Sequence, residues 1–329
     1  MRPLLQAAIL TFTPIVASAQ DTVRFTPTVG HPTFAVRDPV MRIKPNTVII
    51  SNTMHGAYYT REGGAFPGEV GPFFVEGATT NDMLVVKIIR VMPNTGLAAA
   101  NVSGGFGGLQ SDSRLRLVNE PISSRRYLWE LDTTRMVGRT TLPDSRSQSI
   151  EIDLKPMLGR IAVAPRGQEA FSGLWPGDFG GNMDAPELRE GTTVYLPIFH
   201  DGAYFYFGDG HARQGDGEVA GTGLETSMDV VLRIDVVKGR TIDWPRLEDA
   251  EHIMVAGSIR PLVDAFRIAH VELIQWLVDD YGFDRMEAYQ VLSQAGVARV
   301  ANVVDPNYTV VAKFPKSALP PRVRRAEAR

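Results

Sequence analysis

The chain has 329 residues, of which 44% are hydrophobic and 22% charged, with 34 Lys and Arg against 37 Asp and Glu. This length suffices for one large domain or two ordinary ones with a substantial core. The near balance of charge excludes the basic field that nucleic acid binding requires. The absence of cysteine (Cys 0) excludes disulfides, thiolate catalysis and thiolate metal ligands. We therefore expect a globular protein held by core packing or bound ions, with no nucleic acid partner.

Residues 1–19 are predicted to form a cleavable secretory signal peptide. Arg2 precedes an apolar stretch over residues 4–16, and the small residues ASA at 17–19 form a cleavage site. The apolar stretch is too short to cross a bilayer, and no later stretch approaches the ~20 apolar residues of a membrane span. A retained anchor or a disordered N-terminal tail is the alternative. The sequence thus predicts a periplasmic or secreted protein, with no membrane insertion of the mature chain.

Residues 20–240 are predicted to form a mainly β region. Short runs rich in β-branched or aromatic residues, often alternating, are separated by Gly, Pro, Asn and Asp. The runs are TVIIS at 47, MLVVKIIRV at 83, SIEIDL at 149, GRIAVAP at 159, TTVYLPIF at 192, AYFYFG at 203 and MDVVLRIDVV at 228. This pattern is typical of a β-sandwich or barrel. Neither βαβ alternation nor a solenoid repeat is visible.

Residues 241–318 are predicted to form an α+β C-terminal region with a helical pair. After Pro261, apolar residues recur every three or four positions, and Gly282 ends this helix. The apolar face consists of Leu262, Phe266, Ala269, Leu273 and Leu277. Asp284 followed by Glu287 resembles a capping box and predicts a second helix to about Ser293. The run YTVVAKF predicts a last strand, and residues 319–329 are expected to be a disordered tail.

One glycine-rich segment, GDGHARQGDGE at 208–218, combines acids with a histidine. Asp209 and His211 are two positions apart, so their side chains leave the same face if the preceding strand continues. A neutral imidazole and a carboxylate are ordinary zinc ligands, and the glycines let the backbone come close. The alternative is a polar hairpin loop. A phosphate cradle is disfavoured, because Asp209, Asp216 and Glu218 would repel a phosphate.

Two further segments carry polar residues that allow either a structural or a functional interpretation. WPGDFGGNMDAPEL, from Trp175, contains Asn182 and Asp184 and is by itself typical of a long connection. Glu76 stands before a glycine turn at the end of a predicted strand, where a carboxylate is usually solvated. Beside a metal ion, such a carboxylate would serve as general base to a bound water. The sequence has no G-x-S-x-G elbow, so an α/β-hydrolase nucleophile has no support.

Five segments in chain order resemble the signature blocks of the acetamidase/formamidase family. They are GPFFVEGATTNDMLVVKI, LKPMLGRIAVAP, GGNMD, GTTVYLPIFHDGAYFYFGDGHARQGDGE and GTGLE, and the stretch 269–305 resembles the family's helical end. Each block is weak alone, but five in order with sensible spacing form a strong signal over most of residues 71–314. The resemblance implies a mostly β fold with an α+β C-terminal part. It also implies hydrolysis of a small-molecule carboxamide to carboxylate and ammonia, with assistance from a metal.

The resemblance also implies a set of site residues. We assign catalytic roles to Glu76, His211 and Asn182, with Glu76 taking the proton of the water and passing it to the leaving nitrogen. The implied ligands of a divalent metal ion are Asp209, His211, Asp184, Glu218 and Glu225. Zinc is the expected ion, with calcium and magnesium as alternatives. Tyr58, Phe179 and Trp175 are expected to shape the substrate pocket, although aromatic residues in a β protein more often belong to the core.

Two departures from the family pattern leave other functions open. Family members often have a histidine two residues before the GN pair, where this chain has Phe179 and Gly180. In the divergent segment NTMHGAYYTREGG, His55 is either a replacement ligand or base, or a structural residue. The alternatives are a periplasmic binding or structural protein that has lost catalysis, and a hydrolase of cyclic or larger amides. Proteins of this size often assemble symmetrically, so we expect a homo-oligomer.

Overall fold

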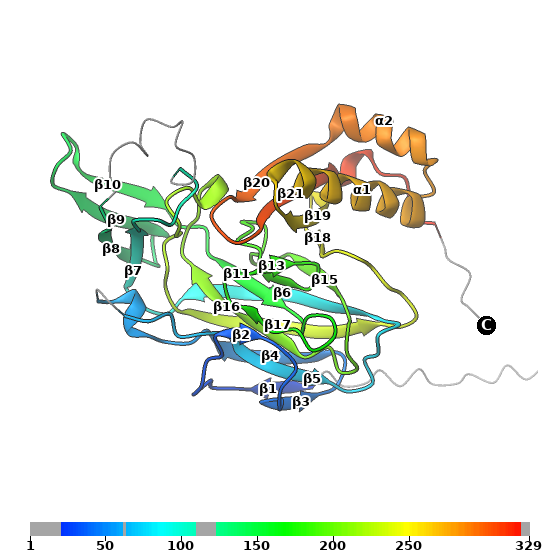
Figure 1. Ribbon diagram of the computed structural model, residues 1–329, viewed down its shortest axis with the longest axis horizontal. Coiled ribbons are helices and arrows are strands. Elements are labelled where there is room, and N and C mark those ends of the chain that lie inside the picture. The colour runs from blue at the N-terminus through cyan, green and yellow to red at the C-terminus, as the bar shows by residue number, and fades with distance from the viewer. Residues whose placement is uncertain (1–20, 62–63, 110–122, 324–329) are drawn as a thin grey trace, which may run out of the picture.

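The structure, a computed structural model, describes residues 21–61, 64–109 and 123–323 and consists mainly of β-strands (Figure 1). Within these ranges both α-helices lie near the C-terminus. The predicted fold class, mainly β with a C-terminal helical pair, is therefore confirmed. The predicted signal peptide lies outside the described residues, as does the end of the predicted tail from residue 324. Residues 319–323, which were expected to belong to a disordered tail, are instead held in place: the Val323 amide donates to the Asp280 backbone oxygen at 2.8 Å, and Arg322 lies 2.7 Å from Glu248. No helix within the described ranges combines the length and apolarity needed to cross a membrane.

The largest sheet has nine strands in the order β1-β4-β17-β6-β15-β18-β19-β21-β20. These are β1 (Thr22–Arg24), β4 (Thr47–Asn52), β6 (Met83–Pro93), β15 (Thr193–Pro197), β17 (Met228–Val237), β18 (Arg246–Glu248), β19 (His252–Ile259), β20 (Val297–Asn302) and β21 (Tyr308–Pro315). Strands before and after residue 240 hydrogen-bond in this one sheet, because β15 pairs with both β6 and β18. The predicted boundary at 240/241 thus separates two parts of a continuous sheet.

A six-stranded sheet, in the order β13-β14-β11-β16-β5-β3, packs against part of the nine-stranded sheet. Its strands are β3 (Met41–Ile43), β5 (Val70–Val75), β11 (Met157–Ala162), β13 (Pro176–Gly177), β14 (Gly180–Asn182) and β16 (Phe205–His211). The main core fills the space between the sheets, with Ile49 and Leu232 from one and Phe73 and Phe207 from the other. The β-branched and aromatic runs of the sequence therefore supply the apolar faces of a two-layer structure.

A smaller four-stranded antiparallel sheet projects from one end of the molecule (Figure 1). It contains β7 (Leu97–Val102), β8 (Arg125–Asp132), β9 (Val137–Leu142) and β10 (Gln148–Asp153). The remaining short elements are β2 (Thr33–Phe34), β12 (Phe171–Ser172) and the 3-10 turns η1 (Ala57–Tyr59), η3 (Asp216–Glu218) and η4 (Lys316–Ala318). Glu225 forms isolated antiparallel bridges to both Ala99 of β7 and His211 of β16. The segment around Glu225 therefore joins the small sheet to the end of β16.

Helices α1 (Leu262–Tyr281) and α2 (Arg285–Ala295) lie together beside the C-terminal strands (Figure 1). Strand β19 shows why a second core forms there. Its alternate residues Ile253 and Val255 pack with the helices, whereas Met254 and Ala256 belong to the main core. The predicted helix ends are confirmed. Gly282, with φ of 73°, terminates α1, and the Asp284 carboxylate accepts hydrogen bonds from the first backbone amides of α2.

Phe266 was expected on the buried face of α1, but its side chain is 45% exposed. The reason is a close contact between α1 and β19. A Cβ on Gly257 would lie 2.5 Å from the Ala265 carbonyl oxygen and 2.8 Å from the Ala269 nitrogen. Small residues therefore bring the helix backbone onto the sheet at Ala265 and Ala269, and this turns Phe266 outward.

Candidate active site

A cavity of about 260 Å³ lies beside β11, β14 and β16, next to η3 and the segment that precedes β17. Its lining contains the carboxylates of Asp184, Asp209, Glu218, Glu225 and Asp305. Asn182, Arg160, Tyr58, Phe66, Phe106 and Leu174 also line it. The structure thus brings together acids that stand up to 121 positions apart in the sequence, since Asp184 and Asp305 share this wall.

Strand β16 places Asp209 and His211 side by side. The Nε2 atom of His211 lies 3.5 Å from Oδ2 of Asp209, so the predicted shared face is confirmed. Asp209 has φ of 59°, and the cavity residues Asp184 and Glu218 have φ of 42° and 48°. Residues other than glycine rarely adopt this left-handed conformation, and such strain concentrates at functional sites. The backbone at these three positions therefore adopts an unfavourable conformation, which directs the three side chains toward the cavity.

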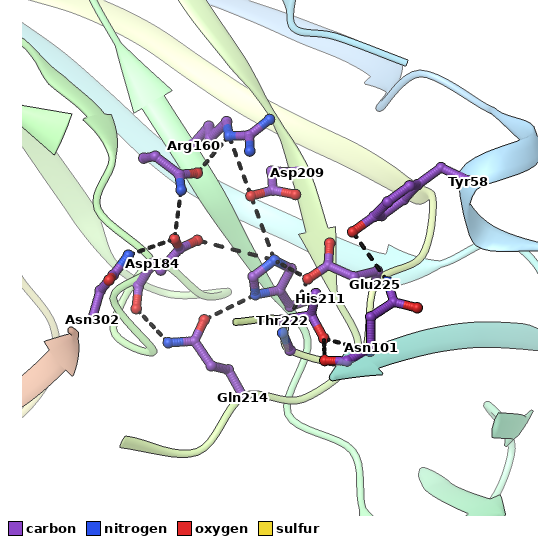
Figure 2. Close-up of polar contacts among 12 residues, drawn as sticks. Tyr58, Asn101, Arg160, Asp184, Asp209, His211, Gln214, Thr222, Glu225 and Asn302 are labelled. Carbon is purple, nitrogen blue, oxygen red and sulfur yellow. Dashed lines mark hydrogen bonds and ion pairs between the residues drawn. The ribbon is translucent and has the colours of Figure 1, made fainter. Parts of the chain in front are cut away.

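The carboxylates surround one atom, Nε2 of His211 (Figure 2). Oε1 of Glu225 lies 3.1 Å from it, and Oδ1 of Asp184 lies 4.0 Å from it. Two groups of potential ligand atoms, each within 4.8 Å of one another, share this histidine. They are Asp184, His211 and Glu218, and Asp209, His211 and Glu225. Every residue predicted to be a metal ligand belongs to one of these buried groups.

Asp184 shows that these residues suit a cation. Its Oδ2 accepts hydrogen bonds from the side-chain amides of Asn182 at 2.7 Å and Asn302 at 2.9 Å. Its Oδ1 is buried and has no hydrogen-bond partner within the described part of the chain. A buried carboxylate oxygen without a partner costs free energy, which a bound cation would relieve. Carboxylates with one imidazole form an ordinary donor set for divalent cations, and they do not by themselves select one ion.

Arg160 provides a permanent positive charge in this acidic cavity. Its Nη1 donates to Oε1 of Glu69 at 2.7 Å, and its Nε donates to Oδ1 of Asn182 at 2.5 Å. The same Nε lies 3.3 Å from Oδ2 of Asp209. Burial alone would raise the pKa of Asp209, but the charges on Arg160 and His211 lower it below its usual range. Arg160 thus keeps Asp209 ionised and fixes its position.

For the other acids, burial outweighs the nearby positive charges and hydrogen bonds that lower the pKa. Burial raises the pKa of Asp184 and of Glu218 well above the usual range, and for Asp184 the nearby Glu218 charge adds to the effect. Burial raises the pKa of Asp305 to about 6. For His211, burial alone would lower the pKa, but Glu225 and Asp209 raise it well above its usual range. The cation-free cavity therefore retains protons that a bound metal ion would displace.

Glu76 does not reach the cavity, so its predicted role as general base needs correction. It follows β5, which runs antiparallel to β16 with Phe73 opposite Phe205. Glu76 therefore lies near the start of β16, whereas Asp209 and His211 stand at its end. Its carboxylate is half exposed and is 3.9 Å from Arg42. Of the two glutamates that flank β5, the one near the site is Glu69, which is buried at the opposite end of the strand and accepts a hydrogen bond from Arg160.

The predicted aromatic pocket residues separate into two groups. Tyr58 lines the cavity, and its hydroxyl accepts a hydrogen bond from the Asn101 amide at 3.4 Å. Phe179 is only 1% exposed, and both Phe179 and Trp175 stack on Phe171. Neither lines the cavity, because Phe179 belongs to the main core and the partly buried Trp175 packs against that core.

His55 also lies outside the cavity lining. It is exposed, and its Nδ1 is 2.9 Å from the hydroxyl of Ser227. Its position favours the structural interpretation over that of a replacement ligand.

Sequence reasoning missed Arg160, Asp305, Asn302 and Gln214. Arg160 had a usable signal, since an arginine interrupts the apolar run MLGRIA, and every residue of that strand is buried. A charge inside such a run needs a buried partner. The other three stand in loops or at strand ends, where a polar residue is ordinary. Their place at the site depends on hydrogen bonds to distant segments, such as those from Gln214 to Ala301 and from Asn302 to Asp184.

Comparisons with known proteins agree on one family. The model of the Acetamidase/Formamidase family matches residues 142–319. The chain is 23% identical to the acetamidase of Mycolicibacterium smegmatis over an alignment of 238 residues. This alignment covers 58% of this chain and 58% of that protein. The chain matches about half the length of such curated relatives.

Solved acetamidase structures share the fold over nearly the whole chain. The crystal structure of the Yersinia enterocolitica acetamidase has a TM-score of 0.82 and 32% identity, over 92% of this chain and 94% of that one. The acetamidase from Bacillus halodurans has a TM-score of 0.75 and 26% identity, over 89% and 97%.

Proposed function

The chain belongs to the acetamidase/formamidase family, and from this premise we propose that it hydrolyses a linear carboxamide to a carboxylate and ammonia with the help of a divalent cation. The observation that carries the proposal is the ring of buried carboxylates around Nε2 of His211 at the cavity. The names of the relatives support amide hydrolysis as the reaction class. The donor set supports assistance by a cation.

The size of the cavity favours a short substrate. Its volume of about 260 Å³ lies below the roughly 300 to 1,000 Å³ of typical drug-sized ligand pockets. Phe66, Phe106 and Leu174 offer apolar contacts to a small acyl group, and the carboxylates offer acceptors to an amide N–H. Formamide and acetamide therefore fit better than a bulky or cyclic amide.

We propose zinc as the ion, held by His211 with carboxylates from Asp184, Asp209, Glu218 and Glu225. When bound, the cation supplies Lewis acidity toward the carbonyl oxygen and acidifies a water. Calcium and magnesium remain alternatives, because carboxylates are hard ligands that suit them also.

Asp305 is the group that we propose for the proton transfer first expected of Glu76. Its carboxylate lines the cavity but stands outside both groups of potential ligands. The amides of Asn182 and Asn302 donate hydrogen bonds to its Oδ2 and fix its orientation. Its pKa, raised by burial to about 6, suits a base that works near neutral pH. The group would act twice, first as the base that takes a proton from the attacking water and then, in its protonated form, as the acid that gives this proton to the leaving nitrogen.

Ammonia release by the purified chain tests the proposal. The substrates would run from formamide and acetamide to bulky and cyclic amides, with chelator and with added zinc. We expect zinc-dependent release from the short amides, and unchanged release by Glu76→Gln, whose side chain lies outside the cavity. A folded, zinc-loaded chain that is inactive on every amide would favour the binding or structural protein that has lost catalysis.

Export and assembly are further proposals that rest on sequence. Residues 1–19 support export to the periplasm or medium, and N-terminal sequencing of the protein from its native host should start at Gln20. A native protein that retains Met1 and stays in the cytoplasm would contradict this. Light scattering of the purified chain would test the proposed homo-oligomer.

A further inference from the structure

Gln214 makes three hydrogen bonds, and together they allow only one orientation of its side-chain amide. The residue is 7% exposed. Its Nε2 donates to the backbone oxygens of Asp184 at 2.6 Å and Ala301 at 3.1 Å. Carbonyl oxygens only accept hydrogen bonds, so the nitrogen must face them and Oε1 must face away. Oε1 lies 2.9 Å from Nδ1 of His211 (Figure 2).

This orientation determines which nitrogen of His211 carries a proton. Oε1 of Gln214 has no proton to donate, so Nδ1 of His211 must be the donor in their hydrogen bond. In a neutral imidazole, protonation of Nδ1 leaves the lone pair on Nε2. Nε2 is the atom that faces Glu225 and Asp209, at 3.1 and 3.5 Å.

The surroundings of the ring add to this constraint. A Cβ on Gly223 would lie 2.8 Å from Nδ1 and 3.0 Å from Cγ of His211, so backbone packs against the ring. A glutamate at position 214 would accept from Nδ1, but it could not donate to the two carbonyl oxygens. It would also add a negative charge beside the carboxylates of the cavity. A neutral amide satisfies all three partners.

We propose that Gln214 is a positioning residue that holds His211 in the Nδ1–H tautomer, so that Nε2 is available to bind the divalent cation. The inference rests on the metal-assisted function proposed above and names the residue that prepares its histidine ligand. Partners of this kind on the second nitrogen of a ligating histidine typically change metal affinity 10- to 100-fold.

Nuclear magnetic resonance of the full mature chain tests the tautomer directly. The protein would carry ¹⁵N-labelled histidine and ¹¹³Cd²⁺ as the probe ion. We expect the His211 ring to show a protonated Nδ1 and an Nε2 coupled to cadmium. Coordination through Nδ1, or a bound cadmium ion that leaves His211 free, would overturn the proposal.

Zinc affinity of variants provides an independent readout. Gln214→Met keeps the length of the side chain but removes the acceptor, and we expect zinc to bind 10- to 100-fold more weakly. Gln275→Met is the matched control, because Gln275 hydrogen-bonds Asp279 on α1 far from the cavity, and its affinity should stay within twofold. Gln214→Glu restores the acceptor for Nδ1 and should recover part of the affinity lost in Gln214→Met.

The outcomes separate this inference from the function on which it rests. Wild-type affinity in a folded Gln214→Met variant would overturn the role of Gln214 and leave amide hydrolysis intact. Weaker zinc binding in Gln214→Met, together with no hydrolysis by the wild type, would support the role of Gln214 and contradict the amidase. If neither methionine nor glutamate at 214 permits folding, the cadmium spectrum of the wild type still decides the question.

Discussion

Gly159 stands where two carboxylates of the site converge. A Cβ at this position would lie 2.4 Å from Oδ1 of Asp184 and 2.5 Å from Oδ2 of Asp209. Neither oxygen can move freely, because amides hold the Asp184 carboxylate and Arg160 holds Asp209. We therefore expect Gly159→Ala to weaken zinc binding at least 10-fold and to destabilise the protein by about 1–3 kcal/mol. Calorimetric titration and denaturant unfolding would measure both effects.

Gly215→Ala is the matched control for this substitution. Gly215 lies in the loop before Glu218, its φ is −87°, and a Cβ there would meet nothing within 4 Å. We expect zinc affinity and stability close to those of the wild type. Equal zinc affinity in Gly159→Ala and Gly215→Ala would show that Asp184 and Asp209 do not share an ion.

Asp305→Asn tests the proposed proton transfer. Asparagine has the same shape and can still accept from the amides of Asn182 and Asn302, so the fold and the substrate KM should change little. Loss of a positioned base typically costs roughly 10² to 10⁴ in rate. We expect kcat for ammonia release to fall by that factor. A kcat within twofold of the wild-type value would show that another residue acts as the base. Asp178→Asn is the control for the loss of an acid, because Asp178 forms an exposed ion pair with Arg166.

At the scale of single elements, features that depend on neighbouring residues in the sequence could be predicted, whereas features that depend on packing against another element could not. The ends of α1 and α2 were predictable because Gly282 and Asp284 act within one turn of chain. Phe266 was misplaced because its orientation depends on Gly257, which belongs to another element. The same limit applies to β5. Its sequence does not reveal that Glu69 lies beside Gly208 while Glu76 faces solvent.

Glu248 on β18 ties the C-terminal segment to the nine-stranded sheet. Its carboxylate lies 2.7 Å from both Lys316 and Arg322, and it accepts from the Tyr195 hydroxyl at 2.9 Å. Burial alone would raise its pKa, but these partners lower the pKa below its usual value. The stability that Glu248 contributes is therefore complete above its unfolded pKa and is lost as the pH falls through its lower, folded pKa.

We expect Glu248→Gln to lose about 1 kcal/mol of unfolding free energy at pH 7. The difference from the wild type should shrink as the pH falls below the ordinary pKa of glutamate and through the lower pKa of Glu248 in the folded chain, because the wild-type carboxyl then becomes protonated. Urea unfolding at several pH values would show this convergence. Glu151→Gln removes a more exposed pair with Arg135 and should cost less at pH 7. A gap that stays constant down to pH 2 would assign the effect to packing instead of charge.

At the scale of the whole molecule, the site joins segments that the sequence keeps far apart. Glu225 bridges β7 and β16, and Asn302 and Asp305 reach the cavity from the C-terminal strands. The resemblance predicted which acids would gather, because it carries the family pattern over by position. It could not predict Arg160 or Gln214 as partners, since their roles depend on distances across the fold. The C-terminal region is therefore part of the site and not a separate attachment.

The cavity contains more buried carboxylates than cationic side chains, and we therefore expect a bound cation to stabilise the whole protein. Asp184, Asp209, Glu218, Glu225 and Asp305 share the cavity, with Arg160 and His211 as the nearby cationic groups. A cation that binds only the folded chain stabilises it, by about 2.7 kcal/mol at a free concentration 100 times Kd. We expect zinc to raise Tm by several degrees and a chelator to reverse the shift, as followed by calorimetry.

The pH dependence of that shift follows from the raised pKa values of Asp184 and Glu218. Protons occupy these groups in the cation-free chain and compete with the ion, so zinc should stabilise the protein more at pH 7.5 than at pH 5.5. In His211→Ala the shift should largely disappear, because the atom at the centre of the ligand groups is gone. Equal Tm values with zinc and with chelator at pH 7.5 would mean that protonation, and not a bound cation, neutralises the buried carboxylates of the cavity. The metal-assisted mechanism would then have no basis in this fold.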